Sequence, residues 1–272
     1  MKRVKKVLIL LLKIIVVLYI LVCIGFYFFQ EHLVFYPQKL PVDHTFEFDQ
    51  NFEEIDIEVP DGGKINTLFF KADSTKGLIF YLHGNAGSLQ GWGSRAKLFT
   101  DLGYDVAMLD YRGFGKSEGK ITSKEQLIED NQLVYEYYKT KYKEKDIIIM
   151  GYSIGSGMAA RLASDNNPQK LILQSPYYEL KETLHEHYPF IPGFLLRYNF
   201  KTHDYLKELN KPVAIIHGKE DLIIPFKSSL KLKNEFKDKI NLYTIEDYGH
   251  IGFDTTQTYV RYMRNILDLK QK

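Results

Sequence analysis

The stretch from Ile147 to Ala160 restricts the fold of this chain more than any other. It begins with apolar residues typical of a short buried strand and ends with small residues typical of a closely packed helix. Between them lies Gly151-Tyr152-Ser153-Ile154-Gly155, which has the form G-x-S-x-G. This pattern places a serine on a sharp strand-to-helix turn, with its hydroxyl clear of the backbone. A side chain at either glycine would collide with the neighbouring strand or helix. The stretch therefore predicts that Ser153 is a nucleophile.

Strands and helices alternate along the chain from about residue 78. The expected strands cover residues 78–82, 104–110, 147–150, 171–175, 213–218 and 241–245. The expected helices cover residues 92–102, 123–139, the start of the small-residue stretch, 225–236 and 255–269. This alternation is typical of an α/β fold whose mostly parallel central sheet carries helices on both faces. A hairpin at residues 55–71 should add an antiparallel edge.

Functional side chains in such sheets gather at the carboxyl ends of the strands. The segment 178–211 does not fit the alternation and lies between two expected strands. It is therefore expected to form a small lid insert above that edge. The predicted catalytic domain is 51–272, and 31–50 is expected to be a linker because prolines limit helix there.

Serine is a weak nucleophile at neutral pH and needs a base, most often histidine. His250 is the predicted base because it follows the expected strand 241–245 in a loop flanked by glycines, which let the loop bend. His83 and His217 each precede a glycine at the end of an expected strand. Both are expected to pack locally.

The base needs a carboxylate that fixes its ring and tautomer. Asp221 lies just past the expected strand 213–218 and is the predicted partner of His250. Glu220 is a rival that should point the opposite way in the turn. Asp247 is a rival that is too close in sequence to His250 to come from a separate loop. The alternative for Asp221 is a solvated surface carboxylate.

Two backbone N–H groups are needed to stabilise an oxyanion. The first is predicted to be that of Ile154, which follows the nucleophile at a helix N-terminus, where amides are free. The second is predicted to be that of Asn85, in the turn after the expected strand 78–82. Ala86 is the alternative donor.

The first thirty residues differ from the rest of the chain. A basic tip at 1–6 precedes an apolar run from Val7 to Phe29 that is long enough to cross a bilayer as a helix. A cleaved signal peptide is the alternative, but no small-x-small cleavage site follows. The basic tip predicts a cytoplasmic N-terminus and an extracytoplasmic catalytic domain, which makes the chain a single-pass membrane protein.

The net charge of +2 argues against a nucleic-acid partner. Cys23 is the only cysteine, so an intramolecular disulfide is excluded and the redox compartment stays open. His185 and His187 have a spacing that a metal could use, but no cysteine lies near them, and no metal site is predicted. The sequence leaves the oligomeric state undetermined.

Four motifs together resemble the α/β-hydrolase superfamily over roughly residues 50 to 270. They are Leu82-His83-Gly84-Asn85-Ala86-Gly87, Asp110-Tyr111-Arg112-Gly113-Phe114-Gly115-Lys116-Ser117, Gly151-Tyr152-Ser153-Ile154-Gly155, and His217-Gly218-Lys219-Glu220-Asp221 with Gly249-His250. The order of serine, aspartate and histidine also belongs to this superfamily. Within it, the set is similar to membrane-anchored α/β-hydrolase-domain proteins, which include lysophospholipases and protein depalmitoylases.

The resemblance implies a cofactor-free serine hydrolase with a Ser-His-Asp triad. It implies that His83 and Arg112 are structural or adjacent to the substrate. The guanidinium of Arg112 is expected to tie strand-end loops together, and a clamp on a substrate anion is the alternative. Depalmitoylases of this subgroup carry N-terminal cysteines for acylation, and Cys23 lies inside the apolar run instead.

The predicted lid is rich in bulky side chains that could wall an acyl pocket, face the bilayer or simply cover the sheet edge. They are Tyr188, Phe190, Ile191, Phe194, Leu195, Leu196, Tyr198 and Phe200. Together with the anchor, they favour a carboxylic ester or thioester of an acyl or lipid-like substrate. A serine peptidase of the same fold is the alternative. A non-catalytic binding protein is disfavoured because it would not need the three triad residues together.

Overall fold

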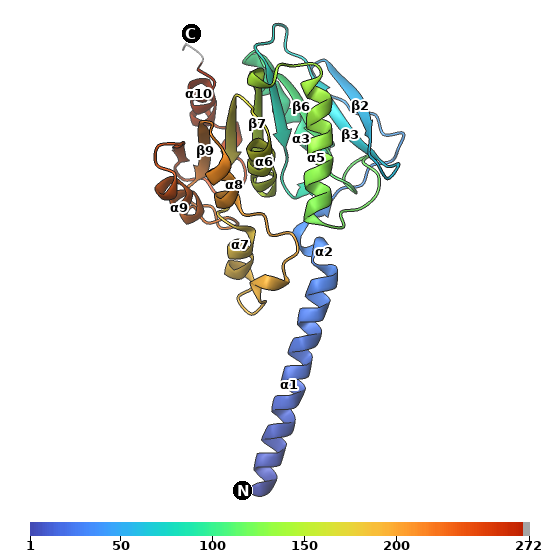
Figure 1. The fold of residues 1–272 in the computed structure, drawn as a ribbon, viewed down its shortest axis with the longest axis vertical. Helices are drawn as coiled ribbons and strands as arrows, with labels where there is room; N and C mark the ends of the chain where they lie inside the picture. Colours follow the sequence, from blue (N-terminus) through green and yellow to red (C-terminus); the bar gives the residue numbers. More distant parts are fainter. Residues whose placement is uncertain (269–272) are drawn as a thin grey trace.

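An eight-stranded sheet forms the centre of the computed structural model, which describes residues 1–268 (Figure 1). The strand order is β10-β9-β8-β7-β4-β6-β3-β2. Six strands run parallel, namely β4, β6, β7, β8, β9 and β10, and β2 and β3 extend the sheet as an antiparallel edge. The strands are β2 Phe52–Glu58, β3 Lys64–Phe70, β4 Leu78–Leu82, β6 Asp105–Leu109, β7 Ile147–Tyr152, β8 Lys170–Gln174, β9 Val213–Gly218 and β10 Ile240–Ile245. The predicted fold class is confirmed.

Helices cover both faces of the sheet and divide its side chains into two apolar cores. One face packs against α5 Lys124–Lys139, α6 Ile154–Asp165, α8 Thr202–Glu208 and α9 Lys227–Glu235. The other packs against α3 Leu89–Trp92, α4 Ala96–Asp101 and α10 Gln257–Ile266. Alternate residues of each strand enter opposite cores, which is why the buried parallel strands read as continuous apolar runs.

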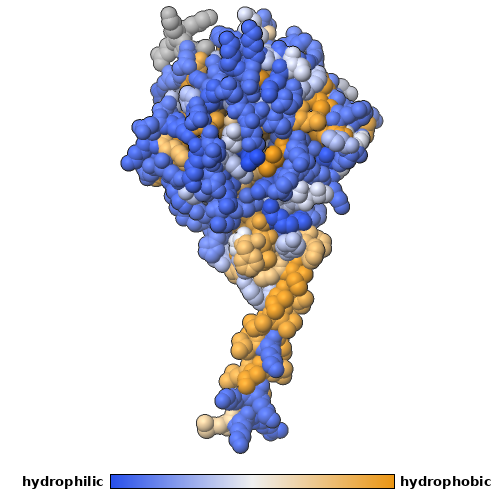
Figure 2. Space-filling view, viewed as in Figure 1, coloured by the Kyte–Doolittle hydropathy of each residue, from blue (hydrophilic) through white to orange (hydrophobic). Residues whose placement is uncertain are grey.

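The N-terminal helix α1, Lys2–Phe29, extends away from the sheet (Figure 1). It has a mean hydropathy of 3.3 over its most apolar window, and none of that window is buried against the described chain. Length and composition therefore make α1 a candidate membrane span. Figure 2 shows its apolar side chains as a continuous shaft below a largely polar domain.

The expected linker at 31–50 instead packs on the domain. Helix α2, Glu31–Val34, leads into β1, Tyr36–Pro37, which pairs with β5, Ala86–Gly87. Phe35 and Phe46 are buried in the two cores. The prolines do limit helix here, but the phenylalanines on either side of them supply apolar area that the domain covers.

The insert between β8 and β9 contains α7, Leu180–His187, the 3₁₀ turn η3, Gly193–Leu195, and α8. The helix expected at 92–102 is interrupted by the 3₁₀ turn η1, Gly93–Arg95. Gly93 lies against the ring of Phe48, where a Cβ would overlap that ring. The last helix was expected to end at Leu269, which lies outside the described residues, as does the domain boundary at 272.

Candidate active site

Ser153 lies on the turn between β7 and α6, with φ 55° and ψ −121°. A positive φ at a residue with a side chain is strained and is held only when its surroundings determine it. An added Cβ at Gly151 would overlap the carbonyl of Gly155, and one at Gly155 would overlap the carbonyls of Leu82 and His83. The two glycines therefore let α6 pack tightly over β7 and β4, as the sequence predicted.

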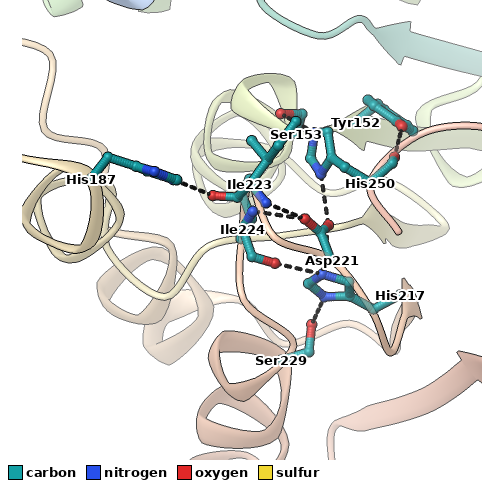
Figure 3. A network of polar contacts seen from close by, with 9 residues as sticks. All are labelled: Tyr152, Ser153, His187, His217, Asp221, Ile223, Ile224, Ser229 and His250. Atoms are coloured by element: carbon teal, nitrogen blue, oxygen red, sulfur yellow. Dashed lines mark hydrogen bonds and ion pairs between the residues drawn. The ribbon is translucent and has the colours of Figure 1, made fainter. Parts of the chain in front are cut away.

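Three predicted side chains meet at the carboxyl edge of the sheet (Figure 3). His250 Nε2 lies 2.9 Å from Ser153 Oγ, and His250 Nδ1 lies 2.6 Å from Asp221 Oδ2. Ser153 comes from the β7 turn, Asp221 from the loop after β9, and His250 from the loop after β10. The distances suit proton transfer from the hydroxyl to an imidazole that a carboxylate orients.

The carboxylate of Asp221 has a hydrogen bond for each lone-pair direction. Its Oδ1 accepts from the amides of Ile223 at 2.9 Å and Ile224 at 2.8 Å, and its Oδ2 accepts from both His217 and His250. Burial alone would raise the pKa of Asp221. The hydrogen bonds from the two histidines, the charge on His250 and the amide of Ile224 outweigh burial and hold this pKa well below its usual range. The rivals Glu220 and Asp247 are exposed.

His217 is a second histidine on the same carboxylate, a contact that the sequence analysis missed. Its Nε2 lies 3.0 Å from both Asp221 Oδ2 and the carbonyl of Ile224, which are acceptors only, so this nitrogen carries a proton. Its Nδ1 lies 2.7 Å from Ser229 Oγ on α9. The separation of four residues from Asp221 was visible in the sequence, but only the turn after β9 brings the two side chains together.

Tyr152, which precedes Ser153 in the sequence, contacts the loop that carries His250. Its hydroxyl donates to the carbonyl of His250 (Figure 3). Its ring packs edge-on to that imidazole and stacks on Phe253. Sequence reasoning did not single it out because any residue fits the second position of the G-x-S-x-G pattern.

Ile154 and Asn85, whose backbone amides are the predicted oxyanion donors, both border the cavity beside Ser153. Within residues 1–268, neither amide donates a hydrogen bond to another group of the chain. The side chain of Asn85 donates to the carbonyl of Val34 at 3.0 Å, and its own carbonyl accepts from Tyr36. These bonds fix the turn on which the second amide sits. Ala86 borders the same cavity.

His83 and Arg112 lie away from the reacting atoms. His83 is fully buried beneath the Asn85 turn, with Nε2 3.3 Å from Asp110 Oδ1 and its carbonyl accepting from the hydroxyl of Tyr111. Arg112 pairs with both oxygens of Asp130 on α5, at 2.7 and 2.9 Å, and reaches Asp61 in the β2–β3 turn. Neither side chain borders the cavity at Ser153, and both contacts are structural.

A cavity of about 520 Å³ extends from Ser153 to the lid and α2. Its walls are mostly apolar and come from α2, the Asn85 turn, α7 and the loop after β9. They include Leu33, Val34, Leu180, Leu184, Leu196, Ile223 and Ile224. Among the described residues, no aspartate or glutamate borders it. Arg95 is its one guanidinium, and this group lies over the ring of Trp92 and pairs with Asp254 at 2.7 Å.

The bulky lid residues take different positions. Ile191, Leu196, Tyr198 and Phe200 are buried, Tyr188 and Leu196 border the cavity, and Phe190 and Phe194 are exposed. The described residues bring together no group of three metal-ligating side chains, and His185 and His187 form no such cluster.

A family model described as serine aminopeptidase, S33, matches residues 73–204. The lysophosphatidylserine lipase ABHD12 of Danio rerio is 32% identical over 181 residues, which are 58% of this chain and 47% of that protein. The chain thus spans about half the length of this relative. The uncharacterized protein YfhR of Escherichia coli O157:H7 is 26% identical over 92% of this chain and 88% of its own length.

Solved structures share the fold. The esterase Pf2001 of Pyrococcus furiosus superposes with a TM-score of 0.67 at 19% identity, covering 86% of this chain and 95% of its own. The family match at residues 73–204 includes Ser153 and Asn85, whereas Asp221 and His250 lie beyond it.

Proposed function

Since this chain belongs to the α/β-hydrolase superfamily, we propose that it is a serine hydrolase that cleaves a carboxylic ester or thioester of an acyl substrate. One observation carries the proposal: the continuous hydrogen-bonded path from Ser153 through His250 to Asp221, which opens into an apolar cavity. An activated nucleophile next to a pocket for hydrocarbon suits acyl transfer from a lipid-like molecule.

In the proposed mechanism, Ser153 Oγ attacks the substrate carbonyl while His250 Nε2 takes the hydroxyl proton. Asp221 stabilises the imidazolium that results. The amides of Ile154 and Asn85 donate to the oxyanion, and such a donor contributes about 10²–10³-fold in rate. The leaving group takes the proton from His250 and departs. Water then attacks the acyl-enzyme by the same route and releases the acid.

The cavity supports an acyl chain as the substrate's apolar part. Its side chains are mostly aliphatic or aromatic, and the single guanidinium of Arg95 stands at its wall. The name of the Danio rerio relative includes a lysophosphatidylserine lipase activity, which agrees with a single-chain lipid ester. We propose a substrate of that class, one acyl chain with a polar leaving group.

A serine peptidase is the second candidate, because the matching family model is described as a serine aminopeptidase. An aminopeptidase has to bind the positive amino terminus of a peptide, which an acidic side chain would favour. No such side chain borders the cavity in the part of the chain that the structure describes. The ester substrate is therefore the better supported of the two.

We also propose how the chain is organised at the membrane. Residues 1–30 would form a basic cytoplasmic tip and an uncleaved anchor, and 51–272 the catalytic domain with its lid at 178–211. The basic residues in the first turns of α1, ahead of its apolar run, support a cytoplasmic N-terminus and an extracytoplasmic domain.

The test is labelling with a fluorophosphonate probe, together with hydrolysis of esters, thioesters and peptide amides by the full chain. Wild type should react with the probe and cleave long acyl esters, whereas Ser153→Ala should do neither. Ser156→Ala is the matched control, since this serine lies in α6 and does not border the cavity. Equal labelling of Ser153→Ala would contradict the proposal, and cleavage of amides alone would favour the peptidase.

A further inference from the structure

The end of the lid forms an apolar surface that no part of the described chain covers. We define the lid tip as residues 188–196, Tyr-Pro-Phe-Ile-Pro-Gly-Phe-Leu-Leu, which contain no charged side chain. Phe190 is 59% exposed and Phe194 is 86% exposed. Exposure of large phenylalanines to water is unfavourable relative to burial. Two of them exposed on one short segment indicate a surface with a partner.

The lid tip is attached to α1, the candidate membrane span. Ile191 and Leu196 pack with Phe26 of α1 in a separate apolar cluster. Gln30, at the end of α1, is fully buried: its amide donates to the carbonyl of Leu195 at 3.1 Å, and its side-chain oxygen accepts from the amide of Arg197 at 2.7 Å. The lid and the anchor are therefore one packed unit.

Polar groups mark the level at which the surface of α1 and the lid changes from polar to apolar. Arg197, just after the lid tip, pairs with Glu31 at 3.1 Å, and Gln30 lies beside them. Between these polar groups and Lys13 of α1, neither the helix nor the lid tip carries a charged side chain, and Figure 2 shows mostly hydrophobic side chains at the junction of domain and shaft. The change from charged to apolar side chains matches the boundary between headgroups and hydrocarbon.

The depth of the lid tip follows from one further contact. The hydroxyl of Tyr19 donates to the carbonyl of Phe190 at 2.9 Å. Gln30 follows Tyr19 by 11 residues, or about 16 Å along a helix that rises about 1.5 Å per residue. The headgroup layer is only about 5–7 Å thick on each side. Even after allowing for the length of a tyrosine side chain, Phe190 lies deeper than this layer if α1 spans the bilayer.

We propose that the lid tip is a second membrane-inserted element, with Phe190 and Phe194 in the leaflet that α1 enters from the domain side. The occupant of this surface is the lipid bilayer, since the surface is continuous with α1 and carries no charge. Rigid docking of the lid on α1 then fixes the domain at one height and tilt above the membrane.

This arrangement has a consequence for the cavity, and that consequence rests on the proposed function. The cavity walls include Leu33 and Val34 of α2, at the foot of the anchor, and Leu184 and Tyr188 of the lid. The proposed position of the lid tip places the entrance of the cavity between these two elements, toward the leaflet. An acyl chain can therefore move from the bilayer to Ser153 without crossing water, which makes the enzyme selective for substrates that reside in the membrane.

The decisive test is the depth of a spin label on the full chain in liposomes. Cys23 is the only cysteine, so Cys23→Ala combined with Phe194→Cys gives one labelling site on the lid tip. Asn265→Cys, on an exposed position of α10 at the far end of the domain from α1, is the control (Figure 1). Accessibility to oxygen and to an aqueous nickel chelate reports the depth of each label.

The label at 194 should be open to oxygen and shielded from nickel, and the label at 265 should show the reverse. Equal nickel access at both positions would overturn the proposal. So would dipolar broadening at 194 that disappears on dilution with unlabelled protein, since it would mean that two lids cover each other. Neither outcome depends on whether the protein is an enzyme.

The delivery of substrate is tested separately by the ratio of two activities, on a long-chain ester held in liposomes and on a soluble short-chain ester. Phe190→Asp with Phe194→Asp should lower this ratio about tenfold, equivalent to about 1.4 kcal/mol and less than the transfer of one phenylalanine. Leu230→Asp, on an exposed apolar position of α9, should keep the wild-type ratio. An unchanged ratio would overturn the delivery step. No turnover of either ester by wild type would count against the proposed function and leave the depth result standing.

Discussion

The replacement Asp221→Asn tests the candidate triad most sharply, because the structure decides how the new side chain must lie. The amides of Ile223 and Ile224 both donate to Oδ1, so the asparagine oxygen has to take that position. Its NH₂ group then replaces Oδ2 and faces His250 Nδ1 at 2.6 Å and His217 Nε2 at 3.0 Å. Two donors that face each other repel, so His250 has to change tautomer, whereas the N–H of His217 Nε2 keeps the carbonyl of Ile224 as an acceptor.

His217 can adapt to this change. Its Nε2–H still donates to the carbonyl of Ile224, and its Nδ1 still accepts from the hydroxyl of Ser229. His250 cannot adapt without loss of function. With Nδ1 accepting, its proton moves to Nε2, the atom 2.9 Å from Ser153 Oγ, and the imidazole can no longer take the serine proton. The variant thus keeps its shape and loses its base.

We expect kcat to fall by about 10³–10⁴-fold, equivalent to about 4–5.5 kcal/mol. KM should change little because Asp221 does not border the cavity. The assay is steady-state hydrolysis of a soluble chromogenic ester by the full chain in detergent. Circular dichroism and thermal unfolding of each variant check that the fold is kept.

Glu220→Gln and Asp247→Asn are matched controls, since each also converts a carboxylate to an amide near His250. Both residues are exposed, and both variants should stay within about twofold of wild type. A fall in kcat of less than tenfold for Asp221→Asn, or an equal fall in either control, would refute the assignment of Asp221 and the tautomer argument with it.

Other variants test the surrounding structure. Arg112→Met breaks the buried pair with Asp130 and should lower the free energy of unfolding in urea by about 3–5 kcal/mol. The folded fraction should keep the wild-type kcat/KM. A selective rise in KM would instead favour a substrate clamp. Gly157→Ala places a Cβ against the hydroxyl of Tyr177 and should cost about 1–3 kcal/mol; an unchanged Tm would contradict this close packing. The pKa of Asp221 is lowered in the folded chain, so its ionised form stabilises the fold at pH values above the unfolded-state pKa of about 4. The difference in unfolding free energy between wild type and Asp221→Asn should therefore shrink as pH falls from about 5 to 3. A difference that does not depend on pH would count against an ionised Asp221.

Local patterns in the sequence were sufficient for the fold class and for the identity of the candidate nucleophile. Continuous apolar runs predict buried parallel strands, and the glycines around Ser153 predict a turn that admits no side chain. Asp221 and His250 could be predicted because each follows a strand of one parallel sheet, and such ends meet at one edge. These inferences depend on neighbours in sequence and on a topology that alternation implies.

Tertiary structure alone decided what depends on contacts between distant segments. Gln30 and Tyr19 look like ordinary residues of an apolar helix and its end, and their bonds to Leu195 and Phe190 arise only when the lid folds back on α1. The expected linker became a wall of the cavity for the same reason, because its phenylalanines find apolar surface on the domain. Periodicity in a sequence reports which side of an element is buried, but not which partner covers it. The serine turn was therefore predictable, whereas its connection to α1 through the lid required the folded chain.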